Sequence, residues 1–232
     1  MVYDKRDRLI LSQDENQRNK PSGKQWSFYL YDYENRAIAT GLYVNTKSRQ
    51  DLQENYIPYL NNGDVQINVL VGVSETITVN NPVVGNSTYC MGCTPNTTVI
   101  NSLNYYDNYN YPAVKSFANG SVFAPANNPY VEPTQKTDRV LGMSTGSKVR
   151  VLDSHYDAVN YTHQFLTTTA YFDEKGRPLQ GLTDNIKGNT DFVTMQYDFS
   201  GKTLSVYERQ FFSTPGSNKI STITQFEYNK IG

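Results

Sequence analysis

A short phrase recurs in this chain of 232 residues: an aromatic residue, Asp, two variable positions, a turn residue and a cation. The complete copies are Tyr3-Asp4…Asp7-Arg8, Tyr31-Asp32…Asn35-Arg36, Phe172-Asp173…Gly176-Arg177 and Tyr197-Asp198…Gly201-Lys202, and Tyr228-Asn229…Gly232 begins a fifth. Such recurrence predicts a repeat architecture. Because copies stand at both ends, we expect a segment of a longer repeat protein.

The phrase has the composition of a β-turn. An Asp carboxylate accepts the N–H two residues on, and Gly, Asn or Asp at the fourth position tolerates positive φ. The fourth positions are Asp7, Asn35, Gly176 and Gly201. We therefore expect each Asp to form a hairpin turn, a role that Asn could also fill, and not to be one of a catalytic pair. Since a lone hairpin is marginal in water, neighbouring copies must pack on one another.

The composition argues against several classes of protein. The formal net charge is −1 with 19% charged residues and no basic block, so nucleic acid is not an expected partner. Aromatic residues make up 13% of the chain, which favours packed strands over disorder. The chain has no run of about 18 apolar residues, and no membrane span is expected. Residues 1–30 lack the apolar core of a signal peptide, so any signal would lie upstream.

The remaining pattern predicts an all-β chain with one short helix near residues 48–57. Ser48 and Asp51 fit helix capping, and Pro58 would end the helix. Val65–Val73 alternates apolar and polar residues, as a half-buried strand does. These signals divide the chain into repeat strands at 1–45, an expanded β region with the helix at 46–165, and repeat strands again at 166–232.

Residues 107–136 form a long stretch that is rich in Pro, Asn and Tyr and has little periodicity. Such a loop is usually functional or pinned across a surface, and we favour a covering segment over a binding loop. Tyr106, Tyr109 and Tyr111 could stack on sugars or pack within the protein. Because the closely spaced acidic ligands of a calcium loop are missing, neither a metal nor a cofactor is predicted.

Two further motifs have competing interpretations. Cys90 and Cys93 could form a loop disulfide in an exported protein, a redox pair or half of a zinc site, and their loop-like context favours the first. Gly142-Met143-Ser144-Thr145-Gly146 matches the nucleophile elbow of hydrolases, but a strand-like sequence follows where a helix is required. A serine hydrolase is therefore not expected.

At these residues the chain resembles the bacterial Rhs/YD-repeat proteins, and more narrowly the large cell-surface Rhs-type proteins of Bacteroidota. The phrases that carry the resemblance are Val2–Leu9, Trp26–Tyr43, Leu103–Pro112, Gly146–Leu152, Leu166–Gln180 and Gln196–Leu204. The resemblance implies a β-hairpin ribbon that forms part of a spiral β-shell, as in toxin-delivery Rhs proteins, toxin complexes and teneurins. Shells of this family enclose a C-terminal toxin or other cargo, which this chain does not contain.

The expected function is therefore that of a non-enzymatic segment of a secreted or cell-surface shell, which encapsulates or displays a toxin or other cargo. Its partners would be the rest of the shell, the cargo, or neighbouring chains that pair with exposed strand edges near Val2–Leu11 and Thr222–Tyr228. The alternative is a carbohydrate-binding or adhesion module that uses the Tyr-rich surface.

Overall fold

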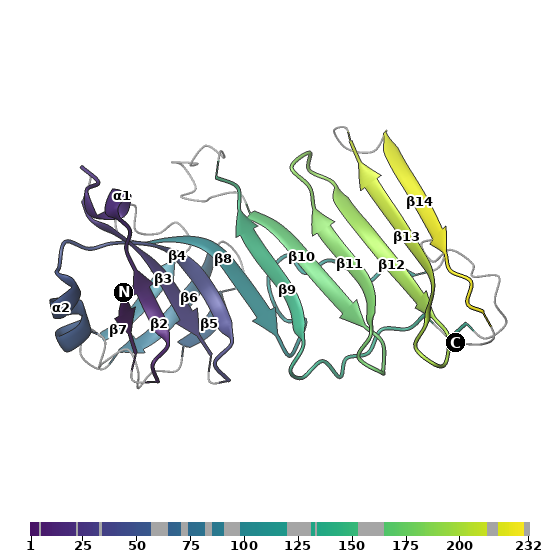
Figure 1. Cartoon of the computed structure of the whole chain (residues 1–232), viewed down its shortest axis with the longest axis horizontal. Helices are drawn as coiled ribbons and strands as arrows, with labels where there is room; N and C mark the ends of the chain where they lie inside the picture. Colours follow the sequence, from purple (N-terminus) through teal and green to yellow (C-terminus); the bar gives the residue numbers. More distant parts are fainter. Residues whose placement is uncertain are drawn as a thin grey trace. The chain divides into compact units, whose positions relative to one another are not determined.

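The computed structural model describes the chain except for residues 5, 22, 33, 57–64, 71–73, 82–84, 91–97, 120–130, 133, 153–164, 213–217 and 230–232, and it leaves out side chains at 55–56, 65–70, 74–81, 85–90 and 98. The described part is antiparallel β structure with two short helical segments, which confirms the all-β class (Figure 1). Two compact units are present, 1–104 with 149–165, and 105–148 with 166–232.

The first unit is built from two antiparallel sheets. One contains, in order, β1 (Val2–Tyr3), β2 (Leu9–Ser12), β3 (Gln25–Tyr31), β4 (Ala37–Val44) and β8 (Thr98–Tyr106). The other contains β5 (Val65–Leu70), β6 (Ser74–Asn81) and β7 (Gly85–Cys90). The buried apolar side chains include Val2, Trp26, Ile38, Leu52 and Leu103. The strand expected from residue 65 is present as β5, and Val71 and Val73 lie outside the described residues.

The expectation of a single helix needs correction, because the first unit has two short helical segments. Helix α1 (Glu15–Arg18) begins at a capping box in which Asp14 and Gln17 bond each other's backbone N–H groups. None of its residues is buried, so it carries no apolar periodicity that sequence reasoning could detect. Helix α2 (Arg49–Asp51) continues as the π-helical turn η1 (Leu52–Tyr56), and Ser48 caps it by accepting the Asp51 N–H at 3.1 Å.

The second unit is a sheet of strands paired in sequence order. These are β9 (Ser144–Arg150), β10 (Phe165–Phe172), β11 (Pro178–Asp184), β12 (Thr190–Tyr197), β13 (Thr203–Phe211) and β14 (Lys219–Gln225) (Figure 1). The cross-strand partners Tyr171, Gln180, Thr194 and Tyr207 share one face and are buried. This face is thus lined largely by side chains that can form hydrogen bonds.

We call residues 108–141 the strap, and its described residues contact three strands of this sheet. The Lys115 N–H donates to Thr169 Oγ1 on β10 at 3.0 Å. The Gln180 amide on β11 accepts the Ala118 N–H at 2.8 Å and donates to the Ala118 carbonyl at 3.1 Å. The Glu132 N–H donates to the Tyr197 carbonyl at the end of β12 at 2.9 Å. The described part of the strap is therefore a covering segment, the arrangement favoured from its sequence.

The sequence predicts exposed strand edges near both ends of the chain, and the structure shows that only one of the two edges is open. At β1, the side-chain amide of Gln53 accepts the Tyr3 N–H at 3.1 Å and donates to the Tyr3 carbonyl at 2.9 Å, so it replaces a strand partner. At β14, all 7 residues are exposed, and among the described strands only β13 pairs with it. Pairing with another chain is thus geometrically open at β14. No described helix has the length and apolarity to cross a membrane.

Candidate functional site

Each complete copy of the phrase closes a hairpin by the same bonds. We call the five residues from Asp to the cation a corner, and the four corners are Asp4–Arg8, Asp32–Arg36, Asp173–Arg177 and Asp198–Lys202. In each, the Asp N–H donates to the carbonyl of the cation at 3.0 Å, and the fourth residue donates to the Asp carbonyl at 3.0–3.2 Å. The fourth residue has φ of 56°, 64°, 77° or 91° in chain order, as predicted. In each of the four hairpins, the register of the strand pairing shifts next to the aromatic residue of the phrase.

The Asp carboxylates are used inside their own corners. In the first three corners Oδ1 accepts the N–H groups of the third and fifth residues at 2.8–3.0 Å. Oδ2 accepts the Arg Nε–H at 2.6–2.7 Å. In the fourth corner, Oδ1 of Asp198 accepts the Lys202 N–H at 2.9 Å and the Ser200 hydroxyl at 2.7 Å. The carboxylates are therefore turn-forming groups.

The electrostatics agree with this role. Burial alone would raise the pKa of Asp4, but hydrogen bonds from Arg8 and from the Arg6 N–H outweigh it, so the pKa lies below its ordinary value. The Ser200 hydroxyl is the largest cause of the lowered pKa of Asp198, and neighbouring N–H groups add to it. A glycosidase acid requires a raised pKa, which is the opposite shift.

Three pairs of consecutive copies are joined by a contact that we call the lock. The cation of one corner lies over the aromatic ring of the next copy, and the hydroxyl of that Tyr donates to the carbonyl of the residue after the cation. Tyr31 donates to Leu9 at 3.0 Å, Tyr197 to Pro178 at 2.7 Å and Tyr228 to Thr203 at 2.9 Å. The rings lie 4.8 Å from Arg8, 4.5 Å from Arg177 and 5.0 Å from Lys202. Cation–π attraction and a hydrogen bond thus join successive hairpins.

Sequence reasoning missed an interrupted copy, Tyr106-Asp107…Gly142-Met143. Asp107 has φ 69°, its N–H donates to the Met143 carbonyl at 3.1 Å, and its Oδ1 accepts the Gly142 N–H at 2.6 Å. These bonds resemble those of a corner, and the strap is inserted between their two halves. The signal was the aromatic–Asp pair, whose turn residue lies too far along the chain to recognise.

The interrupted copy has Met at the cation position, and the copy that follows it begins with Phe. The cation position is Met143, and a Cβ at Gly176 would lie 3.0 Å from its Cε, so Met143 packs against the next corner. Arg8 makes the corresponding contact, because its Nη1 donates to Asn35 Oδ1 at 3.0 Å. With Met in place of the cation, the following aromatic is Phe172, which has no hydroxyl.

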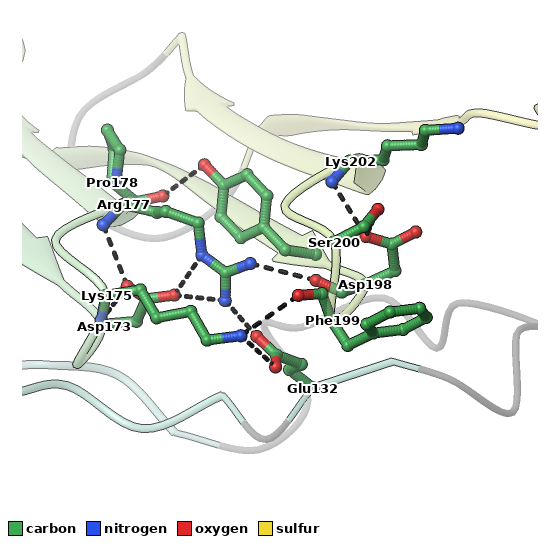
Figure 2. Close-up of polar contacts among 10 residues, drawn as sticks. Glu132, Asp173, Lys175, Arg177, Pro178, Asp198, Phe199, Ser200 and Lys202 are labelled. Atoms are coloured by element: carbon green, nitrogen blue, oxygen red, sulfur yellow. Dashed lines mark hydrogen bonds and ion pairs between the residues drawn. The ribbon is translucent and has the colours of Figure 1, made fainter. Parts of the chain in front are cut away.

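The third corner also binds the strap (Figure 2). Lys175 Nζ lies 2.5 Å from Oε1 of Glu132, and Arg177 Nη2 pairs with its Oε2. Arg177 also pairs with Asp173 and donates from Nη1 to the Asp198 carbonyl at 3.0 Å. Hydrogen bonds from Lys175 first, and from Arg177 second, hold the pKa of Glu132 below its ordinary value. Glu132 is therefore an ionic latch for the strap.

Two of the three tyrosines considered as sugar contacts, Tyr109 and Tyr111, have packing roles. Tyr111 is 5% exposed, its ring stacks on Tyr105 at 4.2 Å, and its hydroxyl lies 2.9 Å from the Thr145 carbonyl. Burial raises the pKa of Tyr111 to about 12. The ring of Tyr109 lies 4.7 Å from Tyr171. Tyr106 is half-buried. The Tyr111 ring therefore has no open face for a sugar.

The other candidate residues lie mostly beyond the described part of the chain. Cys93 and the side chain of Cys90 are not described. Within the described ranges, no group of three or more His, Cys, Asp and Glu side chains is placed to hold a metal ion. Ser144 is the first residue of β9, so a strand follows the elbow-like sequence, as predicted.

Neither a protein-family model nor a curated protein matches this chain significantly.

Replacing Asp173 by Asn is expected to lower the free energy of unfolding by about 1–3 kcal/mol, more than its turn role alone predicted. The new amide NH2 would face the Arg177 Nε–H, which now lies 2.6 Å from Oδ2. Asn185 shows when Asn is tolerated: its Oδ1 accepts the Lys187 and Asn189 N–H groups, and its NH2 faces an acceptor on Asp191. Chemical denaturation followed by circular dichroism would measure the change.

The matched variant is Asp198→Asn, for which we expect a much smaller loss. Lys202 extends over Tyr228, and the bonds to Asp198 Oδ1 come from a backbone N–H and a hydroxyl, which an Asn carbonyl can also accept. Equal losses in the two variants would show that the carboxylate–guanidinium pair adds nothing to the turn.

Acid is expected to release the strap at Glu132. Because the folded-state pKa of Glu132 is lowered, its stabilising contribution is present above the ordinary pKa and is lost as pH falls through the folded value. Protection of the Glu132 amide against hydrogen exchange, corrected for intrinsic rates, should therefore fall below about pH 4. In Glu132→Gln, protection should be low throughout and change little with pH. A wild-type amide that stays protected at pH 2 would contradict the latch.

Proposed function

We propose that this chain is a non-enzymatic segment of the wall of an Rhs/YD-repeat β-shell, secreted or exposed at the cell surface, which encloses or displays a toxin or other cargo. The observation that carries the proposal is the lock. It joins one hairpin to the next by the same three groups in both units, at Tyr31, Tyr197 and Tyr228.

A wall made of hairpins needs contacts that recur at every step, since each hairpin alone is marginally stable. The corners supply such contacts from a few residues: Asp holds its own turn, and in three of the four corners the cation reaches the next copy. The Asp carboxylates bond within their own turns, and this use supports scaffolding better than catalysis. The parts of the proposal that concern the cargo and the cellular location rest on the resemblance to Rhs-type proteins.

The test uses the protein expressed from its complete reading frame. On intact cells or in culture medium, an antibody against residues 166–232 should detect it without permeabilisation. Purified protein treated with a broad-specificity protease should retain a protected segment outside residues 1–232, and a lock-breaking variant such as Arg177→Ala should expose that segment at lower urea. Two results would refute the proposed wall function: detection of the protein only inside cells, or digestion under native conditions of every segment outside residues 1–232.

A further inference from the structure

The open edge of β14 presents a defined set of backbone groups (Figure 1). On its paired side, the Asn218 carbonyl accepts the Phe212 N–H, and beyond the other end of the strand the Phe226 N–H donates to the Leu204 carbonyl. The register between β13 and β14 is constant, and in an antiparallel pair alternate residues bond the partner strand. The even-numbered residues of β14 therefore face β13. The N–H and C=O groups of the odd-numbered residues from 219 to 227 point to the open edge.

The side chains along this edge are accessible and partly apolar. Ile220 is 57% exposed, Ile223 is 56% exposed and Phe226 is 42% exposed, and Lys219 and Glu227 are also exposed. Because side chains alternate along a strand, Ile220 and Phe226 lie on one face of the sheet and Ile223 lies on the other. Sheet edges that stay unpaired are usually protected by Pro or by inward-pointing charges, and residues 220–226 contain neither. A strand that paired here would cover apolar side chains on both faces.

The sequence of the edge is complementary to itself when two copies run antiparallel about Ile223. Each residue then lies opposite one of matching chemistry. The pairs are Lys219 with Glu227, Ile220 with Phe226, Thr222 with Thr224, and Ile223 with the same residue of the other copy. Opposite charges, an aromatic ring beside a β-branched side chain and two threonines are the cross-strand pairs that stabilise antiparallel sheets.

The complementarity also selects the register. A two-fold axis at Ile223 places odd-numbered residues opposite odd-numbered residues, so each N–H that points outward meets a carbonyl that points outward. Moving the centre to Thr222 or Thr224 keeps these backbone bonds but removes the ion pair. It also puts Ile223 opposite Ser221 or Gln225, which are polar. The side chains therefore favour the register centred on Ile223.

We propose that β14 is a self-association surface, at which two copies of this chain pair their β14 strands antiparallel about a two-fold axis at Ile223. The sheet then continues from one copy into the other. Because a two-fold contact uses the same edge on both copies, association at this edge ends at a dimer. The inference rests on the strand alone, so its failure would leave the proposed wall function standing.

Disulfide cross-linking tests the register, in chains whose Cys90 and Cys93 are replaced by Ser. Thr222 of one copy lies opposite Thr224 of the other at a position without direct hydrogen bonds, where Cα atoms are about 4.5 Å apart and a disulfide can form. A mixture of Thr222→Cys chains with differently tagged Thr224→Cys chains should therefore give a mixed disulfide dimer under mild oxidation. Either variant alone should give little, because diagonal positions lie about 7 Å or more apart. A Thr222→Cys chain that cross-links to itself as readily as the mixture, or a mixture that does not cross-link, would overturn the proposal.

Charge reversal tests the ion pairs in the chain that keeps its own cysteines. Because one pair of strands buries less area than a standard interface, sedimentation equilibrium should extend to about 1 mM chain at low salt. Lys219→Glu should weaken the dimer about tenfold, since it turns two attractive pairs into two repulsive ones. The double variant Lys219→Glu/Glu227→Lys should recover the affinity, which also shows that the reversed residues permit folding. The matched control Arg18→Glu makes the same change of charge in α1 and should dimerise as the wild type does. A wild-type chain that is monomeric at about 1 mM, or a double variant that binds no more tightly than Lys219→Glu, would contradict self-association through β14.

Discussion

Replacing Gly41 by Ala should lower the free energy of unfolding of the first unit by about 3 kcal/mol or more. Gly41 lies in β4, where β8 approaches closely and the ladder shifts register between Thr40 and Gly41. An added Cβ would lie 2.1 Å from the Val99 carbonyl oxygen and 2.6 Å from a ring carbon of Phe28. Because the nearest atom belongs to the backbone of a paired strand, relief requires β4 and β8 to separate.

Urea unfolding of Gly41→Ala can be followed by the fluorescence of Trp26, which is the one Trp of the chain and is 3% exposed in the same unit. The matched control is Gly181→Ala in β11 of the second unit, where the nearest atom to an added Cβ is Val193 Cγ1 at 3.2 Å, and it is followed by near-ultraviolet circular dichroism of that unit's tyrosines. A side-chain methyl can move aside, so the control should lose far less stability. Similar, small losses in both variants would show that β8 does not approach β4 as described.

The corners could be predicted from the sequence because everything that forms them lies within five residues. Asp supplies the acceptor, and Gly, Asn or Asp supplies the positive φ, so composition at fixed spacing carries the information. The similar turn at Asn185–Asn189 was missed although Gly188 has φ 79°, because neither an aromatic before it nor a cation after it marks the turn.

The lock, the contacts of the strap and the covering of the β1 edge by Gln53 could not be predicted, because the residues that form them are far apart in sequence. Tyr31 and Leu9 are separated by 22 positions, Gln180 and Ala118 by 62, and Gln53 and Tyr3 by 50. A Gln side chain that substitutes for a strand partner leaves no pattern in its own neighbourhood. The one local sign of the lock was that the aromatic position of the phrase holds Tyr more often than Phe, since only Tyr has a hydroxyl that can donate a hydrogen bond.

Replacing Arg177 by Ala is expected to lower the free energy of unfolding of the second unit by about 2–4 kcal/mol. The substitution leaves the Asp173 carboxylate, whose side chain is 9% exposed, without its cation, and it removes the contact with the Tyr197 ring at 4.5 Å. The control Lys187→Ala removes an exposed cation from the turn at 185–189 and should have little effect. Denaturation followed by near-ultraviolet circular dichroism, which reports on tyrosine packing, would measure both.

A double-mutant cycle separates the lock from the ion pairs around Arg177. Tyr197→Leu removes the ring beneath the guanidinium and the hydroxyl that donates to Pro178, and it leaves the pair between Arg177 and Asp173 in place. If cation and ring act as one lock, the losses in Arg177→Ala and Tyr197→Leu should be non-additive by about 0.5 kcal/mol or more. Additive losses would mean that ring and cation stabilise the hairpins independently. Recurrence of the contact at Tyr31 and Tyr228 would then reflect repeat geometry and not a stabilising link between hairpins.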